Sequence, residues 1–329
     1  MSTTPTAPAA LKLEVLKDGI GLIAFDLPGS RVNTLGRAVV AEFEALGAEL
    51  ARRTDLRGLL LRSGKPGTFI AGADIKEFGA AAAHPEENRQ FIRRGLAFMA
   101  QLEALPYPTV ALIDGACMGG GLEVALSFDQ RLAGTHPKVE IGLPEVKLGI
   151  IPGWGGTQRL TRLIGPSLAA ELICAGEAVK APRARELGIV FDVVPGEALL
   201  DEGVRLIGLL RQTGDWKEMR KRKQQPVGLT DLQLGFAYAV AQAVVLEKTK
   251  GHYPAPVAAL DAIFKGCNLP LEEGLKVEAA AFARILAAMD QMQPLEIPDD
   301  VAADLDAWER NLNQHGIGHA DNGDEDAFR

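Results

Sequence analysis

Short apolar runs alternate with amphipathic segments up to about residue 199, and this alternation constrains the fold more than any other feature of the sequence. The runs 19–29, 56–64 and 109–115 have the length and the flanking turn residues of buried strands. Segments 38–53 and 86–105 instead carry apolar residues at helical spacing. Strands that alternate with helices of about 15 residues predict an α/β arrangement.

The pattern changes after residue 199. Segments 231–251 and 271–291 are helical in spacing, and strand signals disappear. No internal repeat of fixed period is found. We therefore expect four parts: an N-terminal lead at 1–11, an α/β catalytic core at 12–199, a helical region at 200–293 and an acidic tail at 294–329.

The net charge of −8 is a local property of the tail. Residues 294–329 hold 10 acids and 2 bases, so the rest of the chain is neutral. Nucleic-acid binding rests on a basic field, which this sequence lacks. We expect the tail to be solvated and no nucleic-acid partner to bind.

Three features bear on the cellular compartment. No apolar run approaches the roughly 20 residues that span a bilayer, so no membrane span is expected. The first residues lack a basic region followed by an apolar segment, so no secretory signal is expected. Cys117, Cys174 and Cys267 are odd in number and widely spaced, which favours reduced thiols in the cytoplasm.

Several common enzyme motifs are missing from the sequence. It contains no Walker phosphate loop, no dinucleotide-binding glycine fingerprint and no nucleophile elbow of a serine hydrolase. His315 and His319, with Asp321 nearby, have a spacing that can bind a metal. They lie in the acidic tail, where a chance pair is the favoured interpretation, so no metal site is predicted.

Three glycine-rich stretches, at 67–78, 117–126 and 141–165, each follow an apolar strand or turn. Glycine permits sharp turns that present backbone N–H groups to a ligand, and two such groups aimed at one point form an oxyanion hole. Glu123 and Glu145 lie beside two of these turns. Paired acids in an apolar pocket can serve as base and acid. Each piece alone also fits helix packing or a helix-end charge, and the combination favours a catalytic site.

The same stretches resemble the crotonase, or enoyl-CoA hydratase/isomerase, superfamily over about residues 12–290. The similarity is greatest to the hydratase half of the multifunctional fatty-acid oxidation complex α-subunit. The segments that carry the resemblance, in order, are DLPGSRVNTLG, FIAGADIKEF, IDGACMGGGLEVAL, LPEVKLGIIPGWGGTQRLTRLIG and KTKGHYPAPVAALDAI. The resemblance implies a crotonase-like spiral of ββα turns followed by C-terminal helices.

The resemblance also implies roles for individual residues. Ala73 and Gly120 would donate the oxyanion-hole N–H groups to the carbonyl of an acyl-CoA thioester. Glu123 and Glu145 would be the catalytic acid/base pair. Further substrate contacts would come from Ala71, Gly72, Asp74, Ile75, Lys76, Gly119 and Trp154. For Trp154, an ordinary core aromatic is an equal alternative.

The activity that the resemblance implies is enoyl-CoA hydration, in which water adds across the 2,3 double bond of a trans-2-enoyl-CoA in fatty-acid β-oxidation. No metal or redox cofactor is expected, and coenzyme A is part of the substrate. Two alternatives stay open: a Δ3,Δ2-enoyl-CoA isomerase, and a non-catalytic acyl-CoA-binding subunit that docks a separate dehydrogenase. Having both Glu123 and Glu145 favours hydration.

The sequence departs from the family in two ways. Glu123 and Glu145 are 22 residues apart, about two more than the family implies, and we expect the extra residues in a loop at 132–140. The related α-subunit continues into a dehydrogenase, whereas this chain continues into the acidic tail. Expected partners are the acyl-CoA substrate, further copies in a trimer-based homo-oligomer and a separate dehydrogenase. The basic run 217–223 predicts a solvated helix face, or attraction of the CoA phosphates or a partner.

Overall fold

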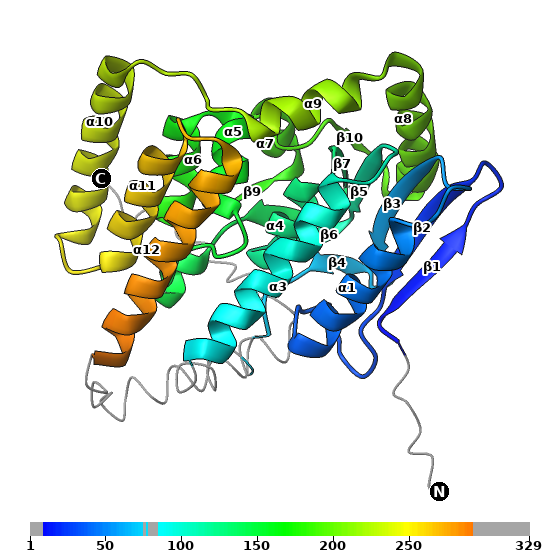
Figure 1. The fold of residues 1–329 in the computed structure, drawn as a ribbon, viewed down its shortest axis with the longest axis horizontal. Helices are drawn as coiled ribbons and strands as arrows, with labels where there is room; N and C mark the ends of the chain where they lie inside the picture. Colours follow the sequence, from blue (N-terminus) through cyan, green and yellow to red (C-terminus); the bar gives the residue numbers. More distant parts are fainter. Residues whose placement is uncertain (1–8, 75–76, 78–84, 292–329) are drawn as a thin grey trace, which may run out of the picture. The chain divides into compact units, whose positions relative to one another are not determined.

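Two β-sheets take their strands alternately from the chain up to Val194 (Figure 1). The computed structural model describes residues 9–74, 77 and 85–291. In the six-stranded sheet, β1 is antiparallel to β2 and the remaining neighbours are parallel. Its strands in spatial order are β1 (Leu11–Val15), β2 (Ile20–Phe25), β3 (Gly58–Ser63), β5 (Thr109–Ile113), β7 (Gln130–Gly134) and β10 (Asp192–Val194).

The second sheet collects the strand that follows each of β3, β5 and β7. Its order is β4 (Gly67–Ile70), β6 (Gly115–Met118), β8 (Glu140–Gly142) and β9 (Ala178–Lys180). The first three are parallel and β9 is antiparallel to β8. Each β-β pair is followed by a helix, so the chain winds as repeated ββα turns. The predicted crotonase-like spiral is therefore confirmed.

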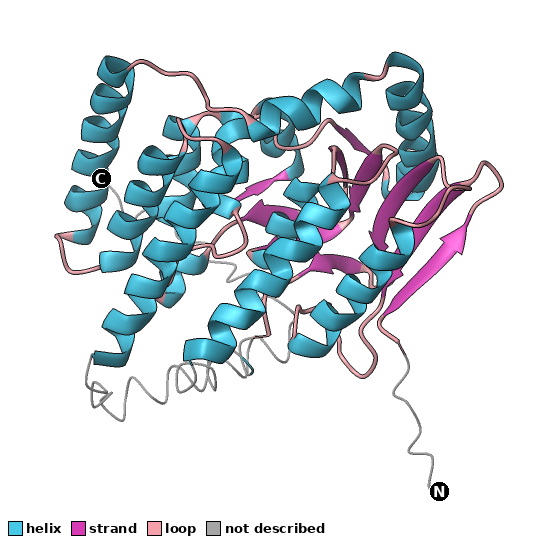
Figure 2. Ribbon diagram, viewed as in Figure 1, coloured by secondary structure: helices cyan, strands magenta, loops and turns pink. Residues whose placement is uncertain are grey.

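The helices lie over the sheets and then continue alone after β10 (Figure 2). Two 3₁₀ segments, η1 (Glu145–Leu148) and η2 (Gly196–Ala198), interrupt the connections. The helices are α1 (Arg37–Leu50), α3 (Pro85–Glu103), α4 (Gly120–Ser127), α5 (Gly156–Ile164), α6 (Pro166–Ala175), α7 (Ala181–Glu186), α8 (Leu199–Thr213), α9 (Asp215–Gln224), α10 (Asp231–Thr249), α11 (Pro254–Gly266) and α12 (Leu271–Gln291).

The six-stranded sheet is buried on both faces, which explains its continuous apolar runs. In β3, Leu59 and Leu61 belong to the main hydrophobic core, whereas Leu60 points to a second core that α8 covers. Successive side chains of a strand point to opposite faces, so a run of three leucines fills both cores at once. All three are 0% exposed.

The predicted strands and helices of the core are found close to their expected bounds. The runs 19–29, 56–64 and 109–115 form β2, β3 and β5, and the segments 38–53 and 86–105 form α1 and α3. The helical region after β10 is present. The expectation that 132–140 is a loop is wrong at both ends of the segment. Its first residues belong to β7, which pairs with β10, and its last residue belongs to β8, which pairs with β6.

The boundary near 199/200 stays a prediction. The chain passes from β10 to η2 and α8 there, and one compact unit runs to Ala287 without a break near 200. The whole acidic tail at 294–329, with His315 and His319, lies outside the described residues, as do Ile75 and Lys76. Among the described helices, none combines the length and the apolar character needed to cross a membrane.

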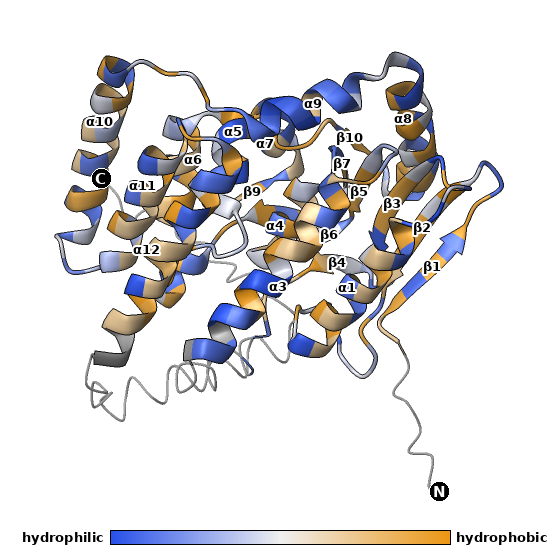
Figure 3. Ribbon diagram, viewed as in Figure 1, coloured by the Kyte–Doolittle hydropathy of each residue, from blue (hydrophilic) through white to orange (hydrophobic). Residues whose placement is uncertain are grey.

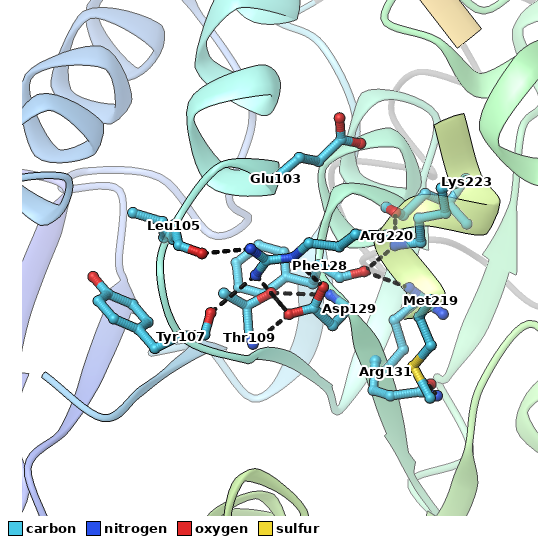
Figure 4. A network of polar contacts seen from close by, with 12 residues as sticks. Glu103, Leu105, Tyr107, Thr109, Phe128, Asp129, Arg131, Met219, Arg220 and Lys223 are labelled. Carbon is cyan, nitrogen blue, oxygen red and sulfur yellow. Dashed lines mark hydrogen bonds and ion pairs between the residues drawn. The ribbon is translucent and has the colours of Figure 1, made fainter. Parts of the chain in front are cut away.

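The basic run at 217–223 lies on α9, which is hydrophilic along most of its length (Figure 3). Two of its cations nevertheless point inward. The Arg220 guanidinium donates to both carboxylate oxygens of Asp129, at 2.6 and 2.8 Å, and to the carbonyls of Leu105 and Tyr107 (Figure 4). Lys223 donates to the carbonyl of Phe128 at 2.5 Å, and burial lowers its pKa to about 7.

This arrangement corrects the interpretation of the run as a purely solvated face. Asp129 is 2% exposed and also accepts from the N–H and hydroxyl of Thr109. Arg220 therefore neutralises a buried carboxylate and ties α9 to the loop that follows α3. Lys221 and Arg222 remain exposed, and each lies 3.9 Å from the carboxylate of Glu218.

We expect Arg220→Met to lower the free energy of unfolding by about 3–5 kcal/mol, because it leaves the Asp129 carboxylate buried without its cation. Urea unfolding followed by circular dichroism measures the change. Arg222→Met is the matched control on the same helix, and its exposed cation should change stability by less than about 1 kcal/mol. Equal unfolding midpoints for the two variants would contradict the structural role given to Arg220.

Candidate active site

The glycines at the start of α4 create the turn that places Glu123. Gly119 has φ 54° and ψ −127°, a conformation that favours glycine, and its N–H donates to the Gly142 carbonyl at 2.9 Å. Gly121 lies so close to β4 that a Cβ there would be 2.3 Å from the Ile70 carbonyl oxygen. The glycine run thus serves both a sharp turn and close packing of α4 on β4.

The Glu123 side chain is 3% exposed and lies against the turn that leads into α5. Its Oε1 accepts hydrogen bonds from the backbone N–H groups of Trp154 and Gly156, both at 2.7 Å. Its Oε2 accepts no hydrogen bond from the described residues. Burial raises the pKa of Glu123 well above its usual value, and the charge of Glu145 raises it further. One oxygen is therefore fixed by the protein, and the other is available to a ligand.

Glu145 begins η1 and brings a second carboxylate to the Gly119 turn at the start of α4. A Cβ on Gly119 would be 2.9 Å from Glu145 Oε1, so the carboxylate lies directly against that glycine. Glu145 Oε2 is buried and has no hydrogen-bond partner among the described residues. Burial raises the pKa of Glu145 to about 8. A buried carboxyl oxygen without a donor favours the protonated form of the acid.

The two glycine turns that were predicted to form an oxyanion hole meet in space. Gly72 has φ 114°, and its Cα would be 3.9 Å from a Cβ placed on Gly119. The Ala71 N–H donates to the Asn33 carbonyl, whereas the Ala73 N–H has no acceptor among the described residues. The N–H of Gly120, the first residue of α4, likewise has none there.

Other predicted contact residues divide into two groups. Ala71, Gly72, Asp74 and Gly119 lie on these two turns. Trp154 is 5% exposed and packs on Phe91, with ring centroids 5.1 Å apart, and on Gly95 and Gly120. These contacts are those of a core aromatic. Its indole also lies 3.5 Å from where a Gly120 Cβ would be, so it supports the turn from behind.

A further buried carboxylate at this turn, that of Glu278 on α12, was not predicted from the sequence. It accepts from the N–H groups of Gly155 and Thr157 in the same turn that Glu123 contacts. The signal that identified Glu123, an acid flanked by apolar residues in a helix, is present around Glu278 as well. No group of three or more His, Cys, Asp or Glu side chains within the described residues is arranged to hold a metal ion.

The chain is similar in sequence to a known family and to curated proteins. The family model described as enoyl-CoA hydratase/isomerase matches residues 16–255. The fatty acid oxidation complex subunit alpha of Shewanella amazonensis is 40% identical over 276 residues, which are 82% of this chain and 38% of that protein. The subunit of the same name from Shewanella frigidimarina is 36% identical over 273 residues, or 83% and 38%. This chain thus spans little more than a third of those relatives' length.

Solved structures agree with the sequence relatives. An enoyl-CoA hydratase from Bacillus anthracis is 26% identical with a TM-score of 0.57, covering 92% of this chain and 96% of that one. An enoyl-CoA hydratase from Geobacillus kaustophilus HTA426 is 26% identical with a TM-score of 0.56, covering 93% and 96%. The ββα spiral, the two glycine turns and the family match over most of the chain lead to one conclusion: the chain belongs to the enoyl-CoA hydratase/isomerase family.

Proposed function

We propose that this chain is an enoyl-CoA hydratase, which adds water across the 2,3 double bond of a trans-2-enoyl-CoA. The observation that carries the proposal is the pair of buried carboxylates, Glu123 and Glu145, at the junction of the two glycine turns. Each has one oxygen that accepts no hydrogen bond from the described residues. Hydration needs two such groups, one for the water and one for the proton delivered to carbon.

In the proposed reaction, the Ala73 and Gly120 N–H groups hold the thioester carbonyl. Attack by water at Cβ builds an enolate-like oxyanion on that oxygen, and each donor contributes about 2.7–4 kcal/mol to its stabilisation. Both N–H groups lack acceptors among the described residues, so neither must break a hydrogen bond in that part of the chain to bind the carbonyl. Preorganised donors of this kind require little rearrangement in the transition state.

Glu123 is the proposed base and Glu145 the proposed acid. Burial disfavours ionisation of both carboxyls, but two backbone N–H groups donate to Glu123 and favour its ionised form. Glu145 Oε2 has no donor among the described residues, and we assign the proton of the pair to Glu145 on that ground, although burial and the charge of Glu145 raise the pKa of Glu123 as well. Glu123 then removes a proton from water as the water attacks Cβ, and Glu145 protonates Cα. General acid–base steps contribute about 10²–10⁴-fold each.

The two alternatives differ in what they need from the site. An isomerase moves a proton between carbons, so one carboxylate suffices. A non-catalytic acyl-CoA-binding subunit needs neither. The presence of both carboxylates supports hydration. We further propose that the hydratase serves fatty-acid β-oxidation in the cytoplasm, that it self-associates, and that it works with a separate dehydrogenase. Cys117 and Cys267 are buried and unpaired, in keeping with a reducing compartment.

The test uses the purified chain with crotonyl-CoA and with a longer 2-enoyl-CoA. Absorbance of the conjugated thioester should fall, 3-hydroxyacyl-CoA should accumulate, and neither EDTA nor the absence of NAD should slow the reaction. A chain that converts 3-enoyl-CoA to 2-enoyl-CoA without hydrating it would be an isomerase. A chain that binds acyl-CoA and converts neither substrate would be a binding subunit.

A further inference from the structure

The turn between η1 and α5 is held by two carboxylates from opposite sides. Glu123 of α4 accepts from the N–H groups of Trp154 and Gly156, both at 2.7 Å. Glu278 of α12 accepts from Gly155 at 2.6 Å through Oε1 and from Thr157 at 2.9 Å through Oε2. Four successive backbone N–H groups therefore donate alternately to one glutamate and the other.

Glu278 determines which backbone N–H groups of the turn can donate hydrogen bonds to Glu123. The donors at Gly155 and Thr157 have their acceptors on α12, so only the donors at Trp154 and Gly156 face Glu123. The Thr157 hydroxyl also donates to Glu278, at 2.5 Å. Glu278 is 1% exposed, and its carboxylate is fully engaged by the turn. The N-terminal end of α5 additionally favours negative charge on both sides.

We propose that Glu278 is a positioning residue for the hydratase site: by fixing the Trp154–Thr157 turn, it aims the Glu123 carboxylate at the reacting water. This inference rests on the proposed function. Glu278 itself contacts no reacting atom. Its role follows from the shared turn, because a shift of those N–H groups would rotate the carboxylate whose Oε1 they hold. A displacement of about 1 Å in a catalytic group can cost on the order of 10²-fold in rate.

Charge adds a second, separable effect of Glu278. The charged and titratable groups around the two glutamates come from α3, η1 and α5; they are Glu103, Glu145, Arg159 and Arg162. Burial raises the pKa of Glu278 to about 7, and the hydrogen bonds from the turn and the charge of Arg159 oppose that rise. Ionised Glu278 raises the pKa of Glu123. Removing the charge should therefore let Glu123 ionise at lower pH.

Three variants separate positioning from charge. Glu278→Gln removes the negative charge. It also replaces one carboxylate oxygen, a hydrogen-bond acceptor, with an amide NH₂ group, a donor that would face a backbone N–H group. Glu278→Asp keeps the charge but is one methylene shorter, so it cannot reach both donors as Glu278 does. Thr157→Val keeps the carboxylate and its two backbone donors and removes the hydroxyl, which donates to Glu278 and accepts from the Gln158 side chain.

We expect kcat for hydration to fall at least about 10-fold in Glu278→Gln and Glu278→Asp, with KM changed much less, because Glu123 is misaimed while substrate contacts remain. The acid limb of the rate–pH profile should move to lower pH in Glu278→Gln and stay in place in Glu278→Asp. Thr157→Val should lose much less of the rate than Glu278→Gln, because both backbone donors remain, and its acid limb should move in the same direction, because loss of the hydroxyl bond raises the pKa of Glu278. Wild-type kcat and an unmoved limb in Glu278→Gln would overturn the inference.

A measurement that does not depend on turnover tests the role of Glu278 separately from the proposed hydratase function. Carbon-13 NMR titration of the Glu123 carboxyl, assigned by its loss in Glu123→Gln, should give a lower pKa in Glu278→Gln than in the wild type. An unchanged Glu123 pKa would contradict the coupling even in an active enzyme. An inactive wild-type chain with the expected pKa change would instead overturn the proposed hydratase function alone. If Glu278→Gln does not fold, kcat in Glu278→Asp decides, and a wild-type value overturns the inference.

Discussion

Glu145→Gln should abolish hydration of 2-enoyl-CoA and isomerisation of 3-enoyl-CoA together. Hydration delivers a proton to Cα, whereas isomerisation removes a proton from Cα and returns one to Cγ, and the carboxyl of Glu145 is the proposed group that exchanges the Cα proton in both reactions. The amide keeps the size of the side chain but cannot exchange a proton at neutral pH. Loss of a general acid typically costs about 10²–10⁴-fold, so little activity should remain. Spectrophotometric assays on both thioesters measure the effect.

The buried position of Glu145 allows a loss of activity in Glu145→Gln to be separated from a loss of stability. Its Oε2 has no hydrogen-bond partner among the described residues, and burial raises its pKa to about 8. The amide, like the protonated carboxyl, carries no charge, so the fold should be about as stable as in the wild type. Loss of activity in Glu145→Gln therefore cannot be attributed to unfolding if its urea midpoint is unchanged or raised.

Glu177→Gln is the matched control for Glu145→Gln. Glu177 pairs with Lys147 of η1 at 2.9 Å, two residues from Glu145, but its side chain is 65% exposed. An exposed ion pair of this kind contributes at most about 1 kcal/mol. The control should hydrate at the wild-type rate. Near wild-type hydration by Glu145→Gln would remove Glu145 from the proposed mechanism.

The features that the sequence predicted are those with local signals. The strand pattern around Leu59–Leu61, the glycines beside Gly119 and the acids at 123 and 145 can each be recognised within a few residues. The spiral brings these segments together because successive strands alternate between the two sheets. Pattern and family resemblance thus predicted the elements and one pair of site residues, and the structure shows that their turns meet.

The features that the sequence did not predict depend on distant pairing. Glu278 lies on α12, and nothing near it in the chain shows that its acceptors would face Gly155 and Thr157. The ion pair of Arg220 with Asp129 joins residues 91 apart. A basic run has the same local signal whether its side chains are solvated or buried. Only the fold determines which of those cations meets a buried carboxylate.

Glu123→Gln should lower hydratase turnover by about 10²-fold or more and spare most of any isomerase activity. The variant suits the geometry, because an amide oxygen can still accept from Trp154 and Gly156 while the amide nitrogen takes the place of Oε2. The turn into α5 is kept, and only the proton-accepting ability of Glu123 is lost. A missing general base accounts for a loss of that size.

Assays of Glu123→Gln on a 2-enoyl and a 3-enoyl thioester separate the two roles, since isomerisation needs no water and can use Glu145 alone. The double variant with Glu145→Gln should hydrate little more slowly than Glu145→Gln itself, because residues that act as a unit are not additive. If Glu123→Gln hydrates at nearly the wild-type rate, Glu123 serves only as an acceptor for the α5 turn, as Glu278 does, and hydration must use a single carboxylate.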